Sequence, residues 1–138
     1  MPNMYVEDPV VSAVAAKIIP NMEWLDVPKI KFLMLIADRS NCLGKCSKAT
    51  GKWKHLTGID YVIEVWQTFW DSASVEAKEA LLYHELMHII SKETDEGEIK
   101  WGIRKHDLEE FFEVAEKYGA WDLAIKTFVE HLAAYKEK

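Results

Sequence analysis

The sequence contains no run of apolar residues long enough to cross a bilayer. Its longest apolar stretch, Phe32 to Ala37, is far shorter than the ~20 residues that a membrane-spanning helix needs. The segment from Met1 to Asp8 also lacks the basic residues followed by an apolar run that are typical of a secretory signal. We therefore expect a cytoplasmic protein with no membrane partner.

Cysteine is scarce, with two in 138 residues. Cys42 and Cys46 lie in a stretch rich in glycine, serine and lysine, which is typical of a loop. Their spacing is not followed by two further ligands at the intervals of a structural zinc site, although His55 could in principle join them. We predict two free thiols in a reducing compartment.

An excess of basic charge is also absent, because the formal net charge is −6. Such a chain has no overall positive field to hold nucleic acid. Residues 39–58 depart from this balance, since they contain Trp53, no acidic side chain, and the cations Arg39, Lys45, Lys48, Lys52 and Lys54. A nucleic-acid-associated binding module is therefore an alternative function. A solvated hairpin tip has the same composition, and the acidity of the whole chain favours that interpretation.

The residues that are present suffice for a core. The chain is 49% hydrophobic and 12% aromatic, which predicts a single domain over residues 1–138. Asp8 and Pro9 are typical of a helix start, and apolar residues follow at helical spacing until Pro20. The runs 30–36, 53–57 and 61–66 predict three strands. Their short connections favour an antiparallel meander.

The second half of the chain predicts mainly helices. Residues 75–90 carry the apolar residues of a buried helix, whereas residues 40–51 and 91–102 are predicted as loops. Another helix is predicted to open at residues 105–110 and to end at Gly119, and a last one to run from Trp121 to about Tyr135. The prediction is an α+β fold with an N-terminal helix, a small three-stranded, mostly antiparallel sheet, a central helix and two C-terminal helices.

The most informative stretch is the HExxH motif formed by His84, Glu85 and His88. In a helix the two histidines stand one turn apart on one face, so both rings can bind one ion while Glu85 lies beside them. Neutral imidazole is a good zinc ligand, and a nearby carboxylate can accept the proton of an attacking water. A pair of core histidines is the alternative, but the helical context, with Ser74 as a cap, favours metal.

A third ligand should come from further along the chain, because two histidines do not make a durable site. His106 is the best candidate, since it stands at the mouth of the next predicted helix. Asp107 beside it could orient a ligand imidazole, or could cap its own helix together with Glu110, and we favour the cap. The other candidates that we weighed are Asp107 itself, Glu109, Glu110 and the surface residue His131.

With these residues in view, the chain resembles the small phage metallopeptidases, which are relatives of the SprT-like and minimal zincin proteins. The resemblance extends over roughly residues 28–112 and is carried by the segments Ala80–His88, Lys105–Phe111 and Tyr61–Trp66. It implies a zincin-like fold in which a small sheet lies against the metal helix. This sequence lacks the C-terminal zinc ribbon found in many SprT-like proteins, which weakens any transfer of their role at DNA–protein crosslinks.

The same resemblance implies a site. Its ligands would be His84, His88 and His106, its catalytic base would be Glu85, and the strand Tyr61–Trp66 would be an edge to which an extended peptide substrate pairs.

We therefore expect zinc-dependent hydrolysis of peptide bonds, with Zn²⁺ as cofactor. A nucleic-acid module and a metal-binding scaffold without turnover remain the alternatives, and the pattern gives no oligomeric state. Tyr83, Tyr61 and Arg104 are guesses for the group that would steady the oxyanion.

Overall fold

The computed structural model describes residues 4–26, 28–36 and 43–136. The described chain is an α+β protein, as predicted, and its contacts divide it into two compact units, Met1–Arg104 and Lys105–Lys138. The two units are described separately below. Within the described residues, no helix combines the length and the apolar character needed to span a membrane.

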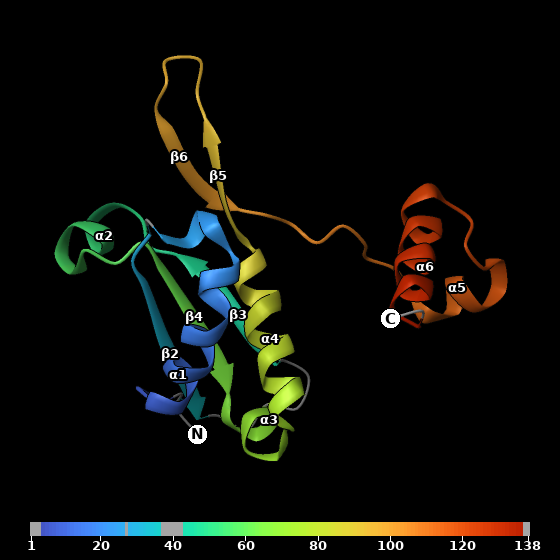
Figure 1. Ribbon diagram of the computed structural model, residues 1–138, viewed down its shortest axis with the longest axis horizontal. Helices are drawn as coiled ribbons and strands as arrows, with labels where there is room; N and C mark the ends of the chain where they lie inside the picture. The colour runs from blue at the N-terminus through green and yellow to red at the C-terminus, as the bar shows by residue number, and fades with distance from the viewer. Residues whose placement is uncertain (1–3, 27, 37–42, 137–138) are drawn as a thin grey trace. The chain divides into compact units, whose positions relative to one another are not determined.

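A four-stranded sheet with the order β1-β2-β4-β3 forms the base of the first unit (Figure 1). Its strands are β1 (Met4–Val6), β2 (Ile30–Ile36), β3 (Gly44–Lys48) and β4 (Tyr61–Trp66). Two of its three pairings, β1–β2 and β3–β4, are antiparallel, so the sheet is mostly antiparallel as predicted, although β1 and β3 were not predicted as strands. The pairing of β2 with β4 is parallel, so the prediction of an antiparallel meander was wrong. The described part of the sheet also has four strands rather than three.

Two helices cover one face of this sheet (Figure 1). The helix α1 (Pro9–Ile18) contacts α4 and β2, whereas α4 (Val75–Met87) contacts β3. Both begin as predicted, because Asp8 accepts a hydrogen bond from the Val10 backbone at 2.8 Å and Ser74 accepts one from Ala77 at 3.1 Å. Short segments complete the unit: η1 (Ile19–Asn21), η2 (Glu23–Asp26) and α3 (Gln67–Ser72).

The core lies between the helices and the sheet. Tyr61, Ile63 and Val65 alternate along β4 and are fully buried, together with Leu82 and Leu86 of α4. Because α4 contributes its buried stripe to this core, its residues are held firmly against the sheet.

The helix α2 (Gly51–Thr57) replaces the strand that was predicted at residues 53–57. All of its residues are exposed, so no buried face selects strand pairing there. Gly58 ends the helix at φ 71°, and its N–H donates to the Lys54 carbonyl at 2.8 Å.

The basic residues of segment 39–58 are distributed over β3 and α2, and Arg39 lies outside the described residues. Lys45 and Lys48 belong to β3, and Lys52 and Lys54 belong to α2. Lys48 donates to the Trp101 carbonyl at 2.5 Å, and Lys54 lies 3.1 Å from Asp60. Lys52 Nζ lies over the Trp53 ring, 5.5 Å from its centroid. Three of the four described cations thus make contacts within the protein.

Asp60 connects three segments at the start of β4. One carboxylate oxygen accepts a hydrogen bond from the Lys29 backbone at 2.8 Å, and the other lies 3.1 Å from Lys54 Nζ. The bond from Lys29, assisted by Lys54, lowers the pKa of Asp60 despite the opposing effect of partial burial. The carboxylate therefore stabilises the fold above the unfolded-state pKa, and this contribution is lost as pH falls through the lower folded-state value.

Replacing Asp60 with Asn should reduce the free energy of unfolding by about 1–2 kcal/mol at pH 6, because two bonds to a charged acceptor are weakened. The difference from wild type should narrow as pH falls below the ordinary Asp value of about 3.9. Urea unfolding at pH 6 and pH 3 measures both effects. The control is Asp95→Asn, a substitution of an exposed aspartate. A difference that stays constant with pH would contradict the assignment.

A β-hairpin follows α4 where an exposed loop was predicted at residues 91–102. It consists of β5 (Ile89–Glu93) and β6 (Ile99–Ile103), which pair antiparallel with Ile89 opposite Ile103 (Figure 1). The turn closes where the Gly97 N–H, at φ 81°, donates to the Thr94 carbonyl at 2.9 Å. Most hairpin residues are exposed, and the polar and acidic residues between Ser91 and Glu98 led to the prediction of a loop, although Ile99, Trp101 and Ile103 do alternate along β6.

The second unit contains α5 (Phe112–Tyr118) and α6 (Leu123–Lys136). The helix predicted to open at residues 105–110 is present, but its predicted start was wrong, because α5 begins only after Phe111 and no side chain caps it. Asp107 and Glu110 therefore form no capping box, and Glu110 instead accepts bonds from the Phe111 backbone and from Trp121 Nε1. Gly119 ends α5 at φ 65°, as predicted.

The apolar stripe predicted along the last helix was Trp121, Ile125, Phe128, Leu132 and Tyr135. Among these only Ile125 is buried, at 8% exposure.

Candidate metal centre

The C-terminal turn of α4 places two histidines side by side. His88 is the C-cap residue and keeps a helical backbone at φ −70° and ψ −18°, so it lies one turn beyond His84 on the same face. The two ring centroids are 5.2 Å apart, and the rings are inclined by 78°. This spacing allows both imidazoles to approach one ion.

The structure brings His106 to this pair. One ring nitrogen from each of His84, His88 and His106 lies within 4.8 Å of the other two. His106 follows Arg104 by two residues, and the Arg104 N–H donates to the His88 carbonyl at 2.7 Å, so the chain connection keeps residue 106 close to His88. Among the described residues no other group of three potential metal ligands is found.

The other sequence candidates for the third ligand do not join this group. Glu110 binds Phe111 and Trp121, and His131 Nδ1 lies 2.8 Å from the Thr127 carbonyl.

The orientation of His88 is set by a backbone carbonyl. Its Nδ1 lies 2.6 Å from the Arg104 carbonyl oxygen, which can only accept a hydrogen bond. Nδ1 therefore carries the proton, and Nε2 carries the lone pair that a metal would bind. Imidazoles that bind metals commonly donate their second ring N–H in this way.

Glu85 is the one buried charged residue of the described chain, with 4% exposure. Its Oε1 lies 3.9 Å from His84 Nε2, and its Oε2 is buried without a hydrogen-bond partner among the described residues. Burial raises the pKa of this carboxyl, while the adjacent His88 partly opposes the rise. A buried carboxylate oxygen without a partner is costly unless a bound group compensates it.

The strand β3 packs closely against the Glu85 side chain at Gly44. A Cβ on Gly44 would lie 3.0 Å from the Glu64 carbonyl, 3.2 Å from Leu81 Cδ1 and 3.4 Å from Glu85 Cγ. Only glycine therefore fits without displacing a neighbour. Sequence reasoning missed this residue because residues 40–51 were predicted as a loop, although a glycine inside a strand is the usual sign of close approach.

Comparison with known proteins supports a metal centre. The family model described as putative phage metallopeptidase matches residues 3–133. The chain belongs to this family. The family name indicates a metal ion and a peptide or protein substrate. No curated protein and no solved structure matches the chain.

The donor set fits the metal that the phage metallopeptidase family implies. Three imidazoles are suitable ligands for zinc and for several other transition metals. The side chain of His84 is 51% exposed and His106 is also exposed, so a water molecule and a substrate can reach the centre. A catalytic site needs such an open position.

Cys46 is not a member of this centre. It is a free cysteine on β3, as predicted, whereas Cys42 lies outside the described residues. Burial, together with the charge of Glu85, raises the pKa of the Cys46 thiol to about 12. The thiol therefore stays protonated near neutral pH.

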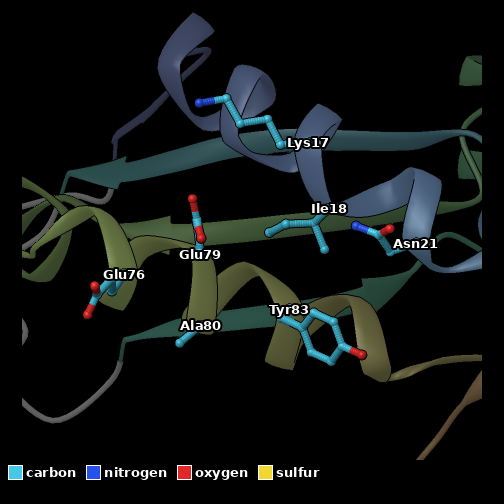
Figure 2. A pocket seen from close by; sticks show the side chains of 7 residues that line it. All are labelled: Lys17, Ile18, Asn21, Glu76, Glu79, Ala80 and Tyr83. Carbon is cyan, nitrogen blue, oxygen red and sulfur yellow. The ribbon is translucent and has the colours of Figure 1, made fainter. Parts of the chain in front are cut away.

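Two of the guesses for an oxyanion-stabilising group lie elsewhere. Tyr61 is fully buried, and its hydroxyl donates to the Gly102 carbonyl at 2.7 Å. Tyr83 lines a groove of about 490 Å³ between α1 and α4, together with Ile18 and Asn21 of the facing segment (Figure 2). None of the residues that line this groove is a histidine.

Proposed function

We propose that this chain is a zinc-dependent metallopeptidase with a zincin-like architecture. The observation that carries the proposal is the cluster of His84, His88 and His106 beside the buried carboxylate of Glu85, whose Oε2 has no hydrogen-bond partner among the described residues. We also propose that the two compact units belong to one metallopeptidase domain over residues 1–138, since the family match runs through both.

The three histidines would hold the ion, and Glu85 would act as general base. Zinc, when bound, lowers the pKa of coordinated water and polarises a carbonyl. Glu85 accepts the proton that the attacking water loses and then gives it to the leaving amine. Its burial favours this role, because a carboxylate with a raised pKa is a stronger proton acceptor.

The substrate shelf that we propose is β3 rather than β4. The predicted edge strand Tyr61–Trp66 was placed wrongly, because β4 lies between β2 and β3 in the sheet. The edge strand next to α4 is β3. Leu43 and Ala49, on either side of β3, form backbone hydrogen bonds with Trp66 and Asp60. In an antiparallel ladder only every second residue bonds to the neighbouring strand. The backbone N–H and C=O groups of Gly44, Cys46 and Lys48 therefore point away from β4. An extended peptide could pair with this edge.

A scaffold without turnover accounts less well for Glu85. Structural zinc sites close with a fourth protein ligand, whereas the cluster in the described residues contains three. A purely structural ion also has no use for a buried carboxylate beside it. The nucleic-acid alternative gains no support from β3 and α2, because Lys48 and Lys54 are engaged within the protein.

Metal analysis of the purified chain tests the proposal. After reconstitution we expect one zinc per chain and cleavage of unfolded casein that stops with a chelator and returns with added zinc. A chain that binds no zinc, or that binds zinc and cleaves neither casein nor a mixed peptide library, would reject the assignment.

A further inference from the structure

The hairpin β5–β6 begins directly at the candidate metal centre. His88 ends α4, and β5 starts at the next residue, Ile89. The Arg104 N–H donates to the His88 carbonyl at 2.7 Å, which extends the ladder by one pair beyond Ile89 and Ile103. His88 and Arg104 are thus opposite residues at the base of the hairpin.

The position of β6 determines how the His88 ring is held. The acceptor of the His88 Nδ1 bond is the carbonyl of Arg104, the first residue after β6. Any displacement of this strand end would move the acceptor and allow the ring to rotate. Hydrogen-bond partners of metal-binding histidines affect metal affinity about 10- to 100-fold.

Three side chains from outside the hairpin fix its base. Tyr61 donates to the Gly102 carbonyl at 2.7 Å, Lys48 to the Trp101 carbonyl at 2.5 Å, and Trp24 Nε1 to the Ile89 carbonyl at 2.9 Å. Lys48 is exposed and Trp24 is 39% exposed, whereas Tyr61 is fully buried. Tyr61 is therefore the most rigid of these three links, because its ring is packed within the core below α4.

We propose that Tyr61 is a positioning residue for the metal centre. Its hydroxyl fixes β6 at Gly102, so that the Arg104 carbonyl two residues later holds the His88 ring in its metal-binding orientation. This inference rests on the proposed function, since it assigns Tyr61 to the same three-histidine site. It adds a link from the central strand β4, which is remote in sequence from the HExxH motif.

A purely structural role for Tyr61 predicts a different outcome. Its hydroxyl would then merely satisfy a buried carbonyl, and the loss of that bond would lower stability without affecting the histidines. The two roles are separated by comparing Tyr61→Phe with Ile63→Val, a change at another fully buried position on the same strand. Both substitutions should cost similar stability.

The experiment measures zinc affinity by competition with a chromophoric chelator, thermal unfolding of the metal-free protein, and the ring ¹⁵N shifts that report the His88 tautomer. Tyr61→Phe should bind zinc about 5- to 20-fold more weakly than wild type, a smaller effect than loss of a direct partner. In metal-free Tyr61→Phe, His88 should populate both neutral tautomers instead of the Nδ1-protonated one alone. Ile63→Val should keep wild-type affinity and tautomer. If Tyr61→Phe does not fold, Lys48→Met, which releases β6 at Trp101, should weaken affinity about 2- to 5-fold.

Each result decides one level of the inference. If the wild type binds zinc, and Tyr61→Phe binds it with an affinity within twofold of wild type and keeps the His88 tautomer, the role of Tyr61 is rejected and the proposed function stays intact. Equal losses of affinity in Tyr61→Phe and Ile63→Val also reject it. Wild-type protein that binds no zinc rejects the proposed function, and the positioning role falls with it.

Discussion

Glu85→Gln is expected to lower the rate of peptide hydrolysis about 10²- to 10⁴-fold, the usual contribution of a general base. Glutamine has nearly the same shape but cannot accept the proton of the attacking water. Zinc should stay bound, because Glu85 is not among the three clustered ligands. Hydrolysis of a fluorogenic peptide at saturating zinc, together with zinc stoichiometry, measures both expectations.

The matched control is Glu76→Gln in the first turn of the same helix, where the side chain is exposed. It should retain the wild-type rate and zinc content. Activity of Glu85→Gln within tenfold of wild type would exclude Glu85 as the base. If zinc were lost along with activity, Glu85 would instead have to be a ligand.

His106→Ala should weaken zinc binding by more than about 100-fold, since even a change beyond the direct ligands costs about 10- to 100-fold. Two imidazoles on α4 would remain, and these cannot hold an ion durably by themselves. Competition with a chelator measures the affinity, and elemental analysis measures the zinc retained after dialysis. Peptide hydrolysis should fall in parallel.

His131→Ala provides the control, because this exposed histidine lies on α6 and its Nδ1 is 2.8 Å from the Thr127 carbonyl. It should bind zinc as the wild type does. Should His106→Ala keep one zinc per chain at wild-type affinity, the third ligand is another residue, and the candidate centre must be redrawn around His84 and His88.

The elements that were predicted correctly are those with strong local signals. Asp8 and Ser74 cap the two helices of the layer, and the β-branched and apolar residues of β2 and β4 marked them as strands. The HExxH spacing indicated the two clustered histidines and the neighbouring carboxylate. His106 was chosen because it stood at the mouth of the next predicted helix, and it joins the cluster although α5 begins only at Phe112. Local chemistry was sufficient for these positions.

The elements that were missed depend on distant partners. Gly44–Lys48 contains little apolar surface, and it becomes a strand because β4 offers a ladder and α4 covers it. The hairpin β5–β6 is largely exposed and is recognisable only from its pairing. The parallel register of β2 and β4 is likewise a property of the assembled sheet. Without β3 in the prediction, β4 was taken for the edge.

The hairpin places the residues that orient His88 at one end and an exposed turn at the other. His88 and Arg104 meet at its base, whereas Thr94, Gly97 and Glu98 close the turn at its far end. We therefore expect that residues at the turn can be exchanged without disturbing the bond between Arg104 and His88 at the base. The turn is then the place in the hairpin where a recognition sequence could be grafted without altering the orientation of His88.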